Sequence, residues 1–159
     1  MGFFGGYVFD GTTWHGFDLD SDHRLDIAAP WLSVYIHDSD IATVRYQPHG
    51  PGSGTAYLGY TPRTYFDDES ASEPADVFRE AEGLALWLIR QRDRNDAVEL
   101  RELIAPFLAG DFREQQSGEH ADGAENADDL DDAGIFVEVK VSRFLTAAGL
   151  PVPHELPSP

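Results

Sequence analysis

The sequence predicts an α+β fold: a mostly antiparallel sheet formed by the N-terminal half plus a strand at 135–141, with two or three helices packed on one face. Three observations lead to this class. Apolar residues alternate with polar ones before residue 66, they recur at helical spacing between residues 72 and 107, and alternation returns at 135–141. A chain of 159 residues fits one domain with one core, which we expect to span 1–159.

Two hairpins are expected near the start of the chain. Asp10-Gly11 separates the stretches GYVFD and TWHGF, and this dipeptide tolerates the positive φ angles of a tight hairpin turn. Residues 32–36 and 42–46 each alternate apolar with polar side chains, and the tetrad HDSD at 37–40 lies between them. We therefore expect a second hairpin whose turn is this tetrad.

The middle of the chain changes from strand to helix. TAYLGY at 55–60 predicts a third strand, which Pro62 ends. From Ser72 the apolar residues fall at helical spacing and predict a buried helix. A shorter second helix is expected from Asp96, which forms a capping pair with Glu99.

The last third combines an acidic segment with a strand and a helix. Residues 111–132 contain many acidic side chains and almost no large apolar ones, which predicts a flexible loop. In IFVEVKV at 135–141, alternate residues are valine or isoleucine, which predicts a strand. Ser142 is expected to cap a short final helix.

Acidic residues outnumber basic ones by 29 to 11, which gives a net charge of -18. This charge repels nucleic-acid phosphates and anionic lipid surfaces, so we expect no direct binding to either, whereas a basic protein is attracted. The absence of cysteine excludes disulfides, thiolate nucleophiles and cysteine-ligated zinc. The sequence contains neither a signal-peptide pattern nor a stretch long enough to span a membrane, so we expect a cytoplasmic protein.

The densest group of possible metal ligands lies in the first 40 residues. His37, Asp38 and Asp40 offer the nitrogen and oxygen atoms that divalent ions accept, and His15 and Asp18 could join them if the two hairpins pack side by side. Aspartate and serine are also the residues that a tight turn requires. We favour the turn, expect no cofactor, and keep a divalent metal centre as the alternative.

Aromatic and charged residues elsewhere are candidates for partner binding. Tyr57, Tyr65 and Arg63 could stand on an exposed side of the sheet, and tyrosine and arginine are enriched in interface hot spots. The acidic segment could steer a basic partner toward the protein. The candidates there are Asp128, Asp129, Asp131 and Asp132.

The function predicted from these observations is that of a non-enzymatic, acidic, cytoplasmic binding protein. Such a protein would recruit a basic protein partner, in the manner of an inhibitor, antitoxin or immunity protein. One alternative is a small metal-dependent hydrolase that uses the histidine and aspartate cluster. Another is a structural or dimerising subunit with an unpaired strand edge, and IFVEVKV is the candidate edge. The sequence does not determine the oligomeric state.

Overall fold

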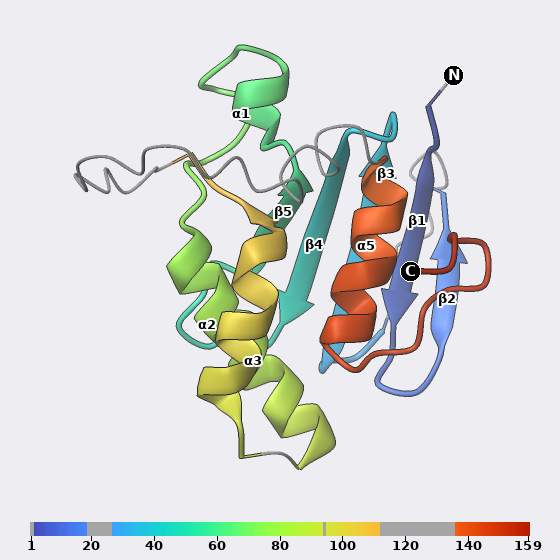
Figure 1. The fold of residues 1–159 in the computed structure, drawn as a ribbon, viewed down its shortest axis with the longest axis vertical. Coiled ribbons are helices and arrows are strands. Elements are labelled where there is room, and N and C mark those ends of the chain that lie inside the picture. The colour runs from blue at the N-terminus through green and yellow to red at the C-terminus, as the bar shows by residue number, and fades with distance from the viewer. Residues whose placement is uncertain (1, 19–26, 94, 112–135) are drawn as a thin grey trace, which may run out of the picture.

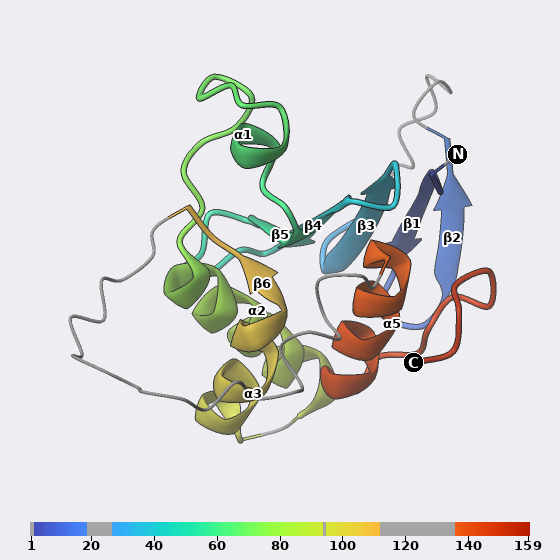
Figure 2. The same cartoon turned by 45° about the horizontal axis from the view of Figure 1, so that its top comes forward.

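The protein folds into one six-stranded antiparallel sheet with helices on one side of it, as Figures 1 and 2 show, which confirms the predicted α+β class. The computed structural model describes residues 2–18, 27–93, 95–111 and 136–159. In the order in which they lie across the sheet, the strands are β2 (Trp14–Phe17), β1 (Gly5–Phe9), β3 (Trp31–His37), β4 (Ile41–Gln47), β5 (Thr55–Gly59) and β6 (Leu108–Ala109).

All described helices come after β1 to β5 in the sequence: α1 directly follows β5, then come α2, α3 and η1, and α5 follows β6 (Figure 1). Both α2 and α5 pack on β4 and β5, and α3 packs on α2 and α5. Because these helices cover only one face of the sheet, the other face contacts loops or solvent. The helices are α1 (Pro62–Tyr65), α2 (Val77–Arg92), α3 (Ala97–Ile104), the 3-10 turn η1 (Ala105–Phe107) and α5 (Val137–Ala147).

The two predicted hairpins and the third strand are present. In β3, Leu32, Val34 and Ile36 are buried against the helices, and the residues between them point to the opposite face. The antiparallel register pairs each of these side chains with a buried residue of β4, so the helix-facing rows continue across the sheet. Alternation in the sequence thus identified both the strands and their buried side.

Helix α2 begins later than the spacing from Ser72 predicted. Asp76 is its N-cap, with extended backbone angles and a side chain that accepts a hydrogen bond from the Arg79 N–H over 3.1 Å. At the other end Asp93 adopts a left-handed conformation with φ of 50°. The indole of Trp87 donates to the Gln47 carbonyl over 2.9 Å, which fixes the helix to the end of β4.

The strand predicted at 135–141 is wrong, because from residue 137 this segment is helix α5. Val137, Val141, Phe144 and Leu145 are buried at the spacing of one helix face. The repeated valines favoured a strand because β-branched side chains have high strand propensity. That preference is weak. The helix is favoured because it buries a continuous apolar face that extends beyond residue 141 to Phe144 and Leu145. The proposed exposed strand edge at IFVEVKV therefore does not exist.

Three smaller differences concern the ends of elements. Ser142 is not a cap but lies inside α5, where its Oγ donates to the Glu138 carbonyl one turn earlier. The predicted cap Asp96 makes no side-chain capping hydrogen bond. Helix α1 was not predicted, although Thr61 as its N-cap and Pro62 as its first residue are typical of a helix start. No helix in the described part of the chain is long and apolar enough to cross a membrane.

Candidate functional site

The polar tetrad at 37–40 forms the turn between β3 and β4. Its central residues Asp38 and Ser39 have φ angles of 53° and 60°, and the Asp40 N–H donates to the His37 carbonyl over 3.1 Å. Two consecutive positive φ angles are typical of a type I′ turn, and short polar side chains tolerate them best. The tetrad is therefore a structural turn, and any further role depends on what surrounds it.

Ser39 joins this turn to the N-terminal segment and to the start of α5. Its Oγ accepts from the Phe3 N–H over 2.7 Å and donates to Glu138 Oε1 over 3.1 Å. Its backbone also pairs, since the Ser39 N–H donates to the Phe3 carbonyl and the Val137 N–H donates to the Ser39 carbonyl. The other carboxylate oxygen of Glu138 is buried without a hydrogen-bond partner. The turn thus organises the N-terminal segment and the first turn of α5 around one nearly buried hydroxyl.

Five aromatic rings gather at this end of the molecule. Phe4 meets His37 edge-on with centroids 5.1 Å apart, and Tyr65 meets Phe66 in the same way at 4.9 Å. His37 lies within 6.3 Å of Tyr65 and links the two pairs, and Tyr60 lies 6.2 Å from Tyr65. Phe4, Tyr60 and Phe66 are each about half exposed, at 53, 51 and 54%. We call these five residues the aromatic patch.

Two carboxylates border the aromatic patch. The Tyr65 hydroxyl donates to Asp38 Oδ2 over 3.4 Å. Partial burial, together with the negative charges of Asp38 and Asp40, raises the pKa of the Tyr65 hydroxyl. Within the described residues, neither carboxylate forms an ion pair with a basic side chain. Among the described residues, no cation therefore balances their negative charge next to the exposed aromatic surface.

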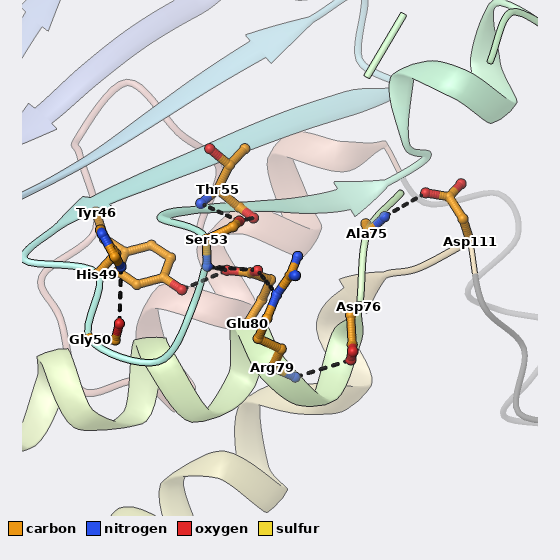
Figure 3. A network of polar contacts seen from close by, with 10 residues as sticks. All are labelled: Tyr46, His49, Gly50, Ser53, Thr55, Ala75, Asp76, Arg79, Glu80 and Asp111. Carbon is orange, nitrogen blue, oxygen red and sulfur yellow. Dashed lines mark hydrogen bonds and ion pairs between the residues drawn. The ribbon is translucent and has the colours of Figure 1, made fainter. Parts of the chain in front are cut away.

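Asp111 anchors helix α1, which ends with Tyr65 and is followed directly by Phe66. The Thr61 hydroxyl donates to Asp111 Oδ1 over 2.6 Å, and the Ala75 N–H donates to Oδ2 over 2.8 Å, as Figure 3 shows for Ala75. Burial opposes ionisation of Asp111, but hydrogen bonds, the largest from Thr61, outweigh it and lower the pKa of this carboxyl. A charged anchor thus fixes the short helix that carries part of the aromatic patch.

The predicted metal ligands lie in different parts of the sheet and its turns. His15 pairs across β1 with Ser33, which lies four residues from His37, or about 13 Å along the strand. Instead of joining His37, the His15 Nε2 contacts Asp10 Oδ2 at 2.8 Å inside the first hairpin. Asp18 follows the end of β2. The structure therefore brings together His37, Asp38 and Asp40 but not His15.

No three His, Asp or Glu side chains within 2–18, 27–93, 95–111 and 136–159 are arranged so that they could hold a metal ion. The arrangement around His37 is dominated by ring contacts instead, with Phe4, Tyr65 and Phe66 on its sides. The described groups thus give the metal-centre hypothesis no support.

The predicted partner-binding residues do not form one cluster either. Tyr65 belongs to the aromatic patch, whereas Tyr57 lies in the middle of β5 on the face away from the helices. Arg63 is on α1, where its Nη2 lies 3.9 Å from the exposed Glu69 carboxylate. The four acidic candidates Asp128, Asp129, Asp131 and Asp132 fall outside the described residues.

A second polar cluster lies inside the molecule around Glu80, which is only 2% exposed (Figure 3). The Tyr46 hydroxyl donates to Glu80 Oε2 over 2.6 Å, and the Ser53 N–H and Arg79 Nε donate to Oε1 over 3.0 and 2.9 Å. Burial, then the hydrogen bond to this carboxylate, strongly raises the pKa of the Tyr46 hydroxyl. This cluster, which we call the Glu80 cluster, fastens the loop at 48–54 to α2.

Two glycines make room for the Tyr46 hydroxyl in the Glu80 cluster. A Cβ atom at Gly52 or at Gly83 would collide with the Tyr46 oxygen. The carboxylate is thus enclosed by protein donors and backbone, so no substrate could approach it. We interpret the Glu80 cluster as structural.

Sequence reasoning missed both Glu80 and most of the aromatic patch. Glu80 is one turn before Leu84 and two turns before Trp87, so its position on the apolar face could have been recognised. Phe4, Tyr60 and Phe66 have no common local pattern, because only the fold brings them together.

Comparisons with families of known proteins, with curated proteins and with solved structures find no match to this chain. Its function must therefore be argued from its own chemistry.

Proposed function

We propose that this protein is a non-enzymatic cytoplasmic binding protein that docks a basic protein partner on the aromatic patch and on the adjacent Asp38 and Asp40 carboxylates. The observation that supports it is the juxtaposition of half-exposed rings with carboxylates that form no ion pair among the described residues. Large exposed aromatics at one place are typical of an interaction site.

The chemistry of the aromatic patch suits lysine and arginine side chains. An aromatic face attracts a cation positioned above it, and the attraction grows when the pair is shielded from water. A carboxylate beside the ring adds a charge-assisted hydrogen bond, which arginine can make with two parallel N–H groups. A neutral apolar partner would have to bury Asp38 and Asp40 without compensation, at a large desolvation cost.

The overall charge favours the same class of partner. A net charge of -18 attracts a basic protein over long range and raises the rate of encounter. Exposed charges are screened beyond about 10 Å at 0.1 M salt, so such a complex should weaken as salt is added. Salt sensitivity is therefore the expected signature of this function.

The test compares the protein with a double variant, Tyr60→Ala with Phe66→Ala, and a charge variant, Asp38→Asn with Asp40→Asn. Asparagine keeps the turn because it also tolerates positive φ. Binding to short peptides rich in arginine or lysine is measured by calorimetry at low salt. We expect each variant to bind about tenfold more weakly, or 1.4 kcal/mol, while circular dichroism is unchanged.

The matched control is Phe78→Ala, which removes another exposed phenylalanine, from α2 and outside the aromatic patch. It should bind the peptides as the parent protein does. The proposal fails if the parent binds basic and neutral peptides equally, or if the aromatic variant loses no more affinity than this control. The same variants used as bait in cell extract would then show whether a natural basic partner depends on the aromatic patch.

A further inference from the structure

Phe136 is an exposed phenylalanine at a position where the fold gains little from it. It is the N-cap of α5, its side chain makes no capping hydrogen bond, and it is 64% exposed. Serine, aspartate and asparagine are the favoured N-caps, because their oxygens accept from N–H groups that the first helical turn leaves unpaired, and apolar residues are the poorest. A large apolar side chain that breaks a local rule without contributing to the core indicates a role outside the fold.

Phe78 offers a comparison, because it is also 64% exposed and also lies near the start of a helix. The N-cap of that helix is Asp76, whose carboxylate accepts from the Arg79 N–H over 3.1 Å. Helix α2 thus has a cap and an exposed phenylalanine beside it, whereas α5 has a phenylalanine in place of the cap. The two rings are equally exposed, so what distinguishes Phe136 is its capping position and its surroundings.

The backbone places Phe136 next to the turn between β3 and β4. Val137, the residue after it, donates its N–H to the Ser39 carbonyl over 2.9 Å. A Cβ atom at Gly59 would lie 3.0 Å from the Val137 side chain, and Gly59 directly precedes Tyr60 of the aromatic patch. Figure 1 shows the start of α5 at the same end of the sheet as this turn. Phe136 therefore borders the residues that carry the aromatic patch.

The aromatic patch and Phe136 come from opposite sides of the sheet. His37 alternates with the helix-facing residues of β3 and so points away from the helices, where the rings of Phe4 and Phe66 meet it. Helix α5, with Phe136 at its start, packs on the helix-covered face of β4 and β5. Exposed aromatic side chains thus approach the turn from both faces of the sheet.

We propose that the surface for a basic partner continues around the turn between β3 and β4 to Phe136, so that the partner covers the turn from both sides. This inference rests on the proposed function, because it takes the same class of partner. Asp38 and Asp40 lie in the middle of this surface, and neither forms an ion pair with a described basic side chain. Glu138, in the first turn of α5, offsets the positive end of the helix dipole, so the start of α5 does not repel a cation. The face of the Phe136 ring attracts one.

The test uses Phe136→Ser, which exchanges the exposed ring for a favoured N-cap. Because the fold does not depend on the ring, we expect the variant to be more stable, with a thermal midpoint about 3 °C higher by circular dichroism. Because the partner contacts the ring, an arginine-rich peptide of about twelve residues, roughly 40 Å when extended, should bind about tenfold more weakly by calorimetry at low salt. A role in binding thus predicts opposite changes in stability and in affinity.

The matched control is Phe78→Ser, which removes an equally exposed ring from α2, where Asp76 already supplies the cap. Phenylalanine and serine have similar helix propensity, so its thermal midpoint should stay close to that of the parent protein, and so should its affinity for the peptide. Phe136→Tyr keeps an aromatic ring and should bind the peptide as the parent does.

The inference is overturned if Phe136→Ser binds the peptide as tightly as the parent, or if its thermal midpoint falls, because the ring would then serve the fold. If the Tyr60→Ala with Phe66→Ala variant still loses affinity in the first case, the proposed function is unaffected and the surface ends at the aromatic patch. A parent that binds arginine-rich and neutral peptides equally ends both proposals. Self-association that Phe136→Ser abolishes, with unchanged peptide affinity, would assign Phe136 to a second copy and also overturn the inference.

Discussion

The Glu80 cluster and the turn around Ser39 are both polar networks that join distant parts of the chain, but they differ in how their charge is balanced. Inside the molecule, the Glu80 carboxylate receives donors from a tyrosine, a backbone amide and Arg79. At the turn, Asp38 and Asp40 have no cationic partner among the described residues, and aromatic rings beside them face solvent. The first network satisfies its groups within the fold, whereas at the turn no described cation pairs with the two carboxylates.

Under our proposal, this difference separates residues that maintain the structure from residues that contact a partner. A buried polar group must find its hydrogen bonds inside the protein, so its removal is felt as lost stability. An exposed group costs little to remove, and its loss is felt in binding. Mutation of Glu80 should therefore lower stability, whereas mutation of the exposed rings and of the two carboxylates at the turn should lower binding.

The largest expected effect is that of Glu80→Ala. It leaves the Tyr46 hydroxyl and the Ser53 N–H without their acceptor in a buried place, and we expect the free energy of unfolding to fall by about 3 kcal/mol. Urea unfolding followed by circular dichroism measures it. The control Glu82→Ala, at an exposed position of the same helix, should change stability by less than about 0.5 kcal/mol. Equal losses in the two variants would contradict the structural role of Glu80.

Tyr46→Phe tests one bond of the Glu80 cluster and should cost about 2 kcal/mol, the range for a hydrogen bond to a charged group. The ring stays, so the packing of the core is kept. Gly83→Ala in the parent protein should be strongly destabilising, because its methyl group meets the Tyr46 oxygen. In the Tyr46→Phe background the same substitution should cost less. Additive losses would show that the hydroxyl does not occupy the space beside Gly83.

Ser39→Gly addresses the turn. Glycine adopts positive φ without strain, but the nearly buried hydroxyl that it removes serves both the Phe3 N–H and Glu138, so we expect the free energy of unfolding to fall by about 1–2 kcal/mol. Locally the effect should be larger, because the Phe3 N–H loses its acceptor. Hydrogen exchange followed by NMR should show faster exchange of that amide and little change in the buried strands. Faster exchange throughout the sheet would mean that the turn supports the whole fold.

The smallest effect on stability is expected at Asp10, whose hydrogen bonds are exposed to solvent. Hydrogen bonds from the Thr13 N–H, the His15 side chain and the Thr12 N–H lower the pKa of Asp10 to about 2. A carboxyl with a lowered folded-state pKa stabilises the fold above its unfolded pKa of about 3.9, and this contribution is lost as pH falls toward 2. Asp10→Asn should flatten that part of the stability profile. Parallel profiles for the two proteins would contradict it.

The sequence was sufficient where structure depends on neighbours along the chain. Alternation and turn residues located both hairpins, because each strand pairs with the next over a short connection. It was insufficient at α5. The sequence pattern around Val137 and Val141 predicted a strand, but in the fold these residues are buried together with Phe144 on one face of a helix. Strand propensity is local, whereas the helix face is fixed by the sheet that it covers.

For the candidate site, the sequence identified the tetrad and Tyr65 but not the patch to which they belong. His37 looked like a metal ligand because its nearest neighbours in sequence are aspartates. In the fold its nearest rings come from the N-terminal segment and from α1, which no local pattern connects. Likewise, a buried Glu80 and an exposed Glu82 differ only in the direction that the helix gives them.

The position of α5 after every described strand has a consequence for biosynthesis. All six strands precede it, yet it supplies Val141, Phe144 and Leu145 to the core. A ribosome therefore releases the described strands before the helix that covers β4 and β5, and the nascent chain carries an unprotected apolar surface until α5 has emerged. The core can close only once α5 has left the ribosome, and truncation before residue 136 should yield chains that aggregate or are degraded.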